Sequence, residues 1–216
     1  MKSTHISIKN LILIIAFACS SILANAMEKS GTIYLIISHE VVNFDAWKPG
    51  FDKDLNARKE AGLKDIFVKQ DLNNSNAITA FFEVTNMKKA EEFLANPELK
   101  NAMEKAGVSS PPVIAFYTSA SKFEKIQSDD MITLISHSVN DFDTWKKVYD
   151  SAEEMRSKAG IKDYLIVRSL ADENVIMAVG TASSTEAFTA FMANPDLKDA
   201  MEKAGATSKP EVAVLL

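Results

Sequence analysis

Apolar and polar residues follow a pattern whose period changes several times along the first half of the chain. Residues 32–41 are β-branched or aliphatic with little interruption and predict a strand. Aromatic and alanine positions then recur at helical spacing from Phe44 to Ala61, behind Asn43 as the expected N-cap and before Gly62 as the expected stop. This stretch predicts a strand followed by a helix.

Two short apolar runs come next, at residues 65–72 and 76–84, and the polar residues between them predict a hairpin. A second helical region begins near residue 86 and restarts at Asn96, where asparagine supplies a cap oxygen and proline takes the first helical position. A closing strand is expected at residues 113–118. The predicted order β-α-β-β-α-β defines a ferredoxin-like unit.

The same pattern recurs 98 positions later, and the string I-S-H-x-V-x-x-F-D-x-W-K begins at both Ile37 and Ile135. A fixed internal period is the signature of a repeated unit, and a unit of this length is a whole small domain. The chain therefore divides into a first repeat at residues 27–118, a polar linker at 119–130 and a second repeat at 131–216.

The two copies differ in local details. Asp141 takes the place of the first N-cap, and the second helical region of the second copy should begin at Ser183, where Glu186 would complete a capping box. Pro49 occurs only in the first copy, inside the first predicted helix. Because proline removes a helical hydrogen bond, we expect a kink or a delayed helix start there.

The predicted sheet of each unit is apolar on both faces. In the first strand Ile33, Leu35 and Ile37 share one side, while Tyr34 and Ile36 share the other. Helices can cover only one face, and a bare face of this kind would exceed the roughly 400 Å² apolar patch that a soluble monomer tolerates. We therefore expect an α+β fold in which the two sheets pack together as an intrachain pseudo-dimer, with further association left open.

The first 26 residues have the pattern of a secretory signal peptide. Two lysines precede an apolar run at residues 11–18, and Ala24-Asn25-Ala26 forms a small-x-small cleavage site. We predict a signal peptide at residues 1–26 and a mature chain that is periplasmic or secreted and no longer attached to the membrane. Cys19 would leave with the peptide, so the mature chain would lack cysteine for a disulfide or a metal site.

The charge pattern excludes some classes of partner. The formal net charge is −5, and lysines and acidic residues are interspersed along the predicted helices. Without a basic cluster, nucleic acid and anionic membrane surfaces are not expected partners. The sequence also contains no glycine-rich phosphate loop, nucleophile elbow or paired-carboxylate signature, and we predict no cofactor.

Three strings together resemble a known family. The repeated I-S-H-x-V-x-x-F-D-x-W-K is followed by A-G-[LI]-K-D and later by N-P-[ED]-L-K-x-A-M-E-K-A-G, in both copies. These strings look like small cyclase-like proteins of the dimeric α/β-barrel superfamily, which also holds the antibiotic-biosynthesis monooxygenases. The resemblance covers residues 32–118 and 130–216. It implies a barrel, usually made by two chains, with a ligand cavity between or beside the sheets, and it implies no particular reaction.

His39 and His137 lie at equivalent strand ends and are the candidate catalytic residues. A neutral imidazole at a cavity mouth could act as a base, or as an axial ligand to haem or a metal. The alternative is a structural histidine that hydrogen-bonds the loop leading to Asp45 or Asp143. No HxxxH or His/carboxylate spacing accompanies either histidine, so no metal site is predicted.

Other repeated or unmatched residues are candidates for ligand binding, each with a simpler explanation. The tryptophans would ordinarily pack in the core between helix and sheet. The arginines could clamp a carboxylate, although an arginine near a helix end more commonly faces water. Tyrosines that occur in only one copy would show whether one copy has become active and the other a scaffold. The candidates are Trp47, Trp145, Arg58, Arg156, Tyr34 and Tyr149.

Three functions remain open from the sequence. The first is a barrel that binds a small, largely apolar molecule, because the interior is apolar with few convergent polar groups. The second is a cofactor-independent monooxygenase-like or cyclase-like enzyme that uses His39 or His137 as a base. The third is a haem or metal binder that uses the same histidines.

Overall fold

The computed structural model describes residues 31–127 and 129–216. The predicted signal peptide lies outside the described residues. Within the described part of the chain, no helix is both long enough and apolar enough to cross a membrane. The described residues divide into two compact units that correspond closely to the two predicted repeats.

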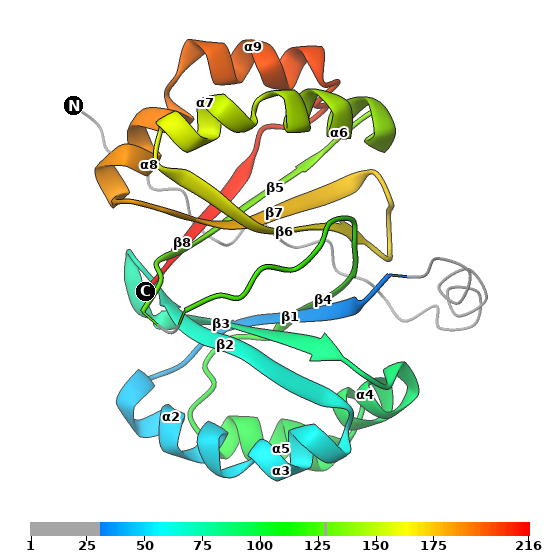
Figure 1. Cartoon of the computed structure of the whole chain (residues 1–216). Coiled ribbons are helices and arrows are strands. Elements are labelled where there is room, and N and C mark those ends of the chain that lie inside the picture. Colours follow the sequence, from blue (N-terminus) through cyan, green and yellow to red (C-terminus); the bar gives the residue numbers. More distant parts are fainter. Residues whose placement is uncertain (1–30, 128) are drawn as a thin grey trace. The chain divides into compact units, whose positions relative to one another are not determined.

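The first repeat is an antiparallel sheet in the order β4-β1-β3-β2, with its helices on one face (Figure 1). Each of the two predicted helical regions forms a pair of shorter helices. The elements are β1 (Ile33–Glu40), α2 (Phe44–Lys53), α3 (Leu55–Glu60), β2 (Leu63–Asp71), β3 (Asn74–Val84), α4 (Met87–Leu94), α5 (Pro97–Lys105) and β4 (Val113–Ser119).

The second repeat has the same arrangement, with its strands in the order β8-β5-β7-β6 and its helices on one face. The predicted α+β class and the tandem ferredoxin-like repeats are therefore confirmed. The elements are β5 (Ile132–Ser138), α6 (Phe142–Ser151), α7 (Glu153–Lys158), β6 (Ile161–Ser169), β7 (Val175–Ala182), α8 (Thr185–Met192), α9 (Pro195–Lys203) and β8 (Glu211–Leu215).

Side-chain caps fix where the helices begin. Asn43 and Asp141 accept hydrogen bonds from backbone N–H groups in the first turns of α2 and α6, as predicted. The predicted cap of α8 was wrong by one residue: Ser184 accepts from the backbone N–H of Ala187. Ser183 instead contacts the turn between α7 and β6, where its backbone N–H donates to the carbonyl oxygen of Gly160.

The proline in α2 does not delay the helix. The helix begins directly after its cap at Asn43 and contains Pro49 in its interior. Both copies instead interrupt the helical region at the same place, at Asp54 in the first repeat and Ala152 in the second. Because the second copy has no proline there, the interruption belongs to the fold, and the prediction of a delayed start was wrong.

Glycine ends the paired helices where the chain turns back into the sheet. Gly62 and Gly160 have φ values of 74° and 73°, in the left-handed region that favours glycine. A Cβ atom at Gly62 would also lie 2.9 Å from the backbone nitrogen of Asn86. These turns bring the end of each first helical region against the start of β2 or β6, which sets the position of the site described next.

Candidate functional site

A cavity that is partly open to the surface lies in the second repeat, between the helix-covered face of its sheet and helices α6 to α9. It offers about 70 Å³ to the centres of water-sized molecules. Since about 10–15 Å³ of such space holds one water, this is room for roughly five waters or one small ring. The lining is mostly apolar and consists of Thr133, Ile135, His137, Trp145, Val148, Tyr149, Ala152, Met155, Arg156, Ile161, Asp163, Ala178, Gly180, Phe191, Met192, Leu197, Ala200, Met201 and Ala204.

His137 enters this cavity from β5 as a neutral imidazole. Its side chain is buried, and neither ring nitrogen has a hydrogen-bond partner among the described residues. Burial lowers the pKa of His137 from 6.5 to about 4, so the ring carries no charge at pH 7. The edge of Trp145 packs against it, with ring centroids 5.8 Å apart. The proposed hydrogen bond to the loop before Asp143 is not formed.

His39 has the same surroundings in the first repeat. It is buried, both ring nitrogens lack a partner within the described residues, and burial lowers its pKa to about 4. Trp47 packs against it with centroids 5.5 Å apart, in a core cluster with Val41 and Ile78. The histidine–tryptophan contact is therefore common to both repeats, and only the one in the second repeat faces the cavity described above.

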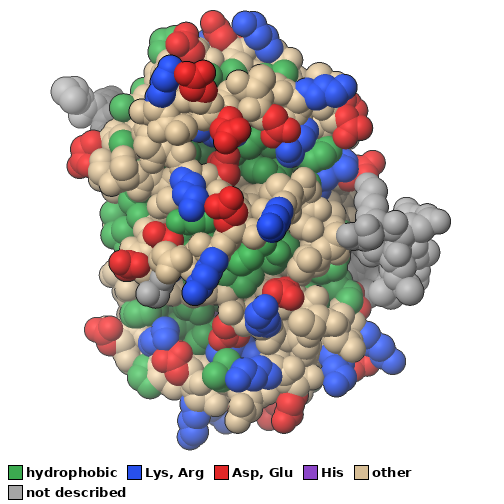
Figure 2. Space-filling model, viewed as in Figure 1, with side chains coloured by type: hydrophobic (Ala, Val, Ile, Leu, Met, Phe, Trp, Pro, Cys, Tyr) green, Lys and Arg blue, Asp and Glu red, His purple; other side chains and the backbone are tan. Residues whose placement is uncertain are grey.

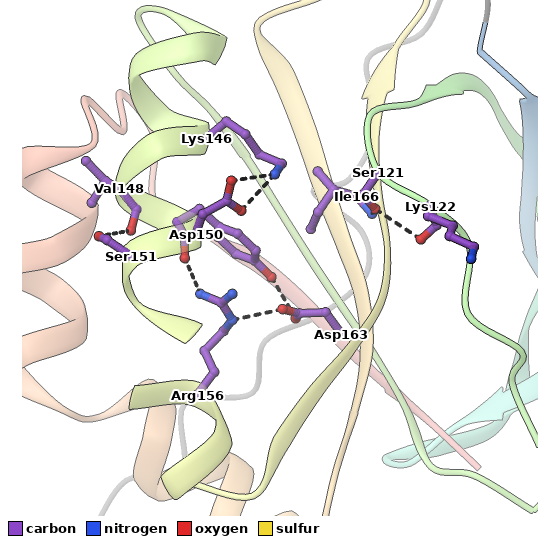
Figure 3. Close-up of polar contacts among 10 residues, drawn as sticks. Ser121, Lys122, Lys146, Val148, Asp150, Ser151, Arg156, Asp163 and Ile166 are labelled. Atoms are coloured by element: carbon purple, nitrogen blue, oxygen red, sulfur yellow. Dashed lines mark hydrogen bonds and ion pairs between the residues drawn. The ribbon is translucent and has the colours of Figure 1, made fainter. Parts of the chain in front are cut away.

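A partly buried polar network also lines the cavity (Figure 3). The Nε atom of Arg156 donates to Oδ2 of Asp163 at 2.9 Å, and Nη1 donates to the backbone carbonyl oxygen of Tyr149. The hydroxyl of Tyr149 donates to the other carboxylate oxygen, Oδ1, at 2.6 Å. Burial, followed by the nearby Asp163 charge, raises the pKa of Tyr149 well above 10, so the hydroxyl keeps its proton.

The first repeat has the same arginine and aspartate but a closed pair. Arg58 donates from Nε to Oδ1 of Asp65 at 3.1 Å and from Nη2 to Oδ2 at 2.6 Å, a bidentate contact. The equivalent of Tyr149 is Phe51, which has no hydroxyl to compete for the carboxylate. The simpler alternative for Arg58 and Arg156, a side chain that faces water, does not apply, because both side chains are buried.

The cavity arises where the two copies differ in size and polarity. Thr133 and Gly180 line it in the second repeat, and their equivalents in the first are Leu35 and Phe82. Both of these larger side chains are fully buried in one apolar cluster, against which Phe51 also packs. The space that is open in the second repeat is therefore occupied by side chains in the first.

Some of the predicted ligand-binding residues line the cavity and others lie elsewhere. Trp145, Tyr149 and Arg156 meet around the cavity together with His137. Tyr34 does not line it and instead stacks on Phe81, with ring centroids 5.2 Å apart. Sequence reasoning overlooked Asp163, Thr133 and Gly180. The last two could have been found as positions where an otherwise repeated sequence changes in size.

Charged side chains of both signs are mixed on the surface, and those of the described residues form no group that could hold a metal ion. Figure 2 shows Lys and Arg side chains interspersed with Asp and Glu on the face it presents. Several ion pairs join a lysine and an acidic residue four positions apart on the same helix. In α6, for example, Lys146 Nζ lies 2.7 Å from Asp150 Oδ1. Among the described residues, no group of three or more His, Cys, Asp or Glu side chains is arranged to hold a metal ion.

No protein-family model matches the chain, and no curated protein matches it in sequence. Solved structures do match, and their likeness extends over both ferredoxin-like units of this chain. At 11–13% identity these likenesses establish the fold alone.

Three of these structures match over most of their length. An anthrone oxidase-like protein has 11% identity and a TM-score of 0.62, covering 87% of this chain and 91% of that chain. A proposed monooxygenase from Lactobacillus acidophilus NCFM has 13% identity and a TM-score of 0.54, covering 87% and 94%. A ferredoxin fold protein related to antibiotic biosynthesis monooxygenases, from Listeria monocytogenes 4b F2365, has 12% identity and a TM-score of 0.50, covering 88% and 98%.

Proposed function

We propose that this protein binds a small, largely apolar molecule in the cavity of its second repeat. The observation that carries the proposal is a mostly apolar cavity lined by a neutral imidazole that has no hydrogen-bond partner among the described residues. Binding sites for small molecules are typically apolar clefts with a few well-placed polar groups. A buried nitrogen without a partner costs about 1–3 kcal/mol, and a bound molecule can recover part of that cost.

The proposal can be tested by filling the cavity. Thr133→Leu places in the second repeat the residue that the first repeat has at Leu35, so the variant is expected to fold. Toluene binding, measured by calorimetry and by the rise in melting temperature, should be present in the wild-type protein and lost in the variant. Circular dichroism of both proteins controls for folding. Equal toluene binding by the two proteins would refute the proposed site.

A second candidate is a cofactor-independent oxygenase or isomerase with His137 as the base. It is favoured by the free ring nitrogens of His137 in the cavity and by the names of two structural neighbours, an anthrone oxidase-like protein and a proposed monooxygenase. A pKa of about 4 makes the imidazole a weak base at neutral pH, and this favours binding over base catalysis. Oxygen uptake with a single-ring substrate such as hydroquinone, which suits a space of this size, should then fall in His137→Ala and persist in His39→Ala.

The cavity does not fit a metal ion or a haem, so neither is proposed. Its lining contains one histidine, one carboxylate and no cysteine, and the carboxylate is already hydrogen-bonded by Arg156 and Tyr149. A porphyrin ring is far larger than a space that holds roughly five waters. Titration with haem should therefore leave the Soret band unchanged.

We also propose that the protein is exported to the periplasm or secreted, on the basis of the signal-like pattern in residues 1–26. N-terminal sequencing of the protein recovered outside the cytoplasm should begin at Met27. Recovery of the chain with its first residues intact from the cytoplasm alone would contradict export.

A further inference from the structure

The arginine donates two hydrogen bonds to its aspartate in the first repeat but only one in the second. In the first repeat Nε and Nη2 of Arg58 both donate to the Asp65 carboxylate. In the second repeat Nε alone donates to Asp163, because the Tyr149 hydroxyl takes the other oxygen. Nη2 of Arg156 then has no hydrogen-bond partner among the residues that the structure describes.

The surroundings of this guanidinium point to the cavity. Arg156, Tyr149 and Asp163 all line it, and Arg156 is only 7% exposed. The guanidinium carbon lies 3.8 Å from the centroid of the Tyr149 ring, so the arginine is held in place by stacking as well as by its hydrogen bonds. An arginine fixed in this way presents its remaining N–H groups in a defined direction.

We propose that Tyr149 is a specificity-determining residue: it opens the Arg156–Asp163 pair so that Nη2 of Arg156 donates to an acceptor oxygen of the bound molecule. The inference rests on the proposed function and names the class of ligand. The ligand is a small ring compound with one carbonyl oxygen. It is uncharged, because the guanidinium charge is already balanced by Asp163 and His137 contributes no charge.

Three probes of similar size separate these features in the full-length protein. Acetophenone has a ring and a carbonyl oxygen, toluene has a ring alone, and benzoate has a ring and a negative charge. Wild-type protein should bind acetophenone about tenfold or more tightly than toluene, because a hydrogen bond from a charged donor is worth at least that factor. Benzoate should bind more weakly than acetophenone, because moving its charge from water into a mostly apolar space costs free energy and the Arg156 charge is already balanced by Asp163.

The decisive variant is Tyr149→Phe. It installs the residue that the first repeat has at Phe51, so a folded protein with a bidentate Arg156–Asp163 pair is expected. Acetophenone affinity should fall about tenfold while toluene affinity is unchanged. The mirror variant Phe51→Tyr, in the repeat whose space is filled, should leave both affinities at the wild-type level.

Several outcomes would overturn the inference. Tyr149→Phe could retain full acetophenone affinity, or it could lose toluene and acetophenone equally, which would assign the tyrosine to packing alone. Benzoate binding more tightly than acetophenone would show that the site takes anions. If toluene binds and only the acetophenone preference is missing, the proposed cavity stands and the role of Tyr149 falls. If no probe binds the wild-type protein, both fall.

Discussion

Protonation of the two buried histidines should destabilise the folded protein at acidic pH. The pKa of His39 and of His137 is lowered by burial from 6.5 to about 4. Between these two values the unfolded chain holds more protons than the folded chain. Their contribution to stability is therefore fully present above pH 6.5 and is lost as the pH falls through 6.5 toward 4.

The magnitude follows from the difference between the two pKa values. A difference of about 2.5 corresponds to about 3 kcal/mol per histidine once the pH is below 4. At pH 5 the loss is about 2 kcal/mol for each. This is a large part of the 5–15 kcal/mol by which a typical native protein is stable, so the change is measurable.

The assay is urea unfolding at pH 7, 6 and 5 for the wild-type protein, His39→Gln, His137→Gln and the double variant. Glutamine does not titrate, so each single variant should lose about half of the histidine-dependent change, and the double variant should lose all of it. Carboxylates titrate alike in all four proteins and cancel in the comparison. The same dependence on pH in the wild-type and double-variant proteins would refute the reasoning.

Three further changes test the packing. Arg58→Ala leaves the Asp65 carboxylate without its buried partner and should cost about 3 kcal/mol by urea unfolding at pH 7, and a cost under 1 kcal/mol would make the pair unimportant. Gly180→Ala places a Cβ atom 2.6 Å from the Lys162 carbonyl oxygen and should lower the free energy of unfolding by about 1–3 kcal/mol in the same assay. An unchanged free energy would show that the strand moves to make room. Asn96→Ala removes the cap of α5 and should lower stability by about 1 kcal/mol, where an unchanged midpoint would contradict the cap.

The sequence predicts the order of elements well because the signals for it are local. A cap such as Asn96, a stop such as Gly62 and the apolar alternation of a strand each depend on a few neighbouring residues. The predicted delayed start at Pro49 was wrong, because α2 begins directly after its cap, and the helical region is interrupted in both copies, with or without proline.

The site was only partly predictable. His137, Trp145 and Arg156 stood out by repetition, and Tyr149 by its absence from the first copy. The environment of Arg156 could not be chosen from spacing alone, because its partner, Asp163, is held on the adjoining strand β6 by the fold. Whether a set of apolar residues fills its space or leaves a cavity depends on how their volumes fit together, and no spacing rule measures that.

The comparison of the two repeats also shows what does not define the site. A buried histidine beside tryptophan occurs in both, with the same lowered pKa and without a partner for either ring nitrogen, so this contact alone cannot mark function. The second repeat differs from the first in having smaller side chains at Thr133 and Gly180 and an additional hydroxyl at Tyr149. An open space weakens packing, and duplication confines that weakness to one copy while the other keeps a filled core. The residues that differ between the copies, more than the residues they share, are therefore the ones that should govern binding.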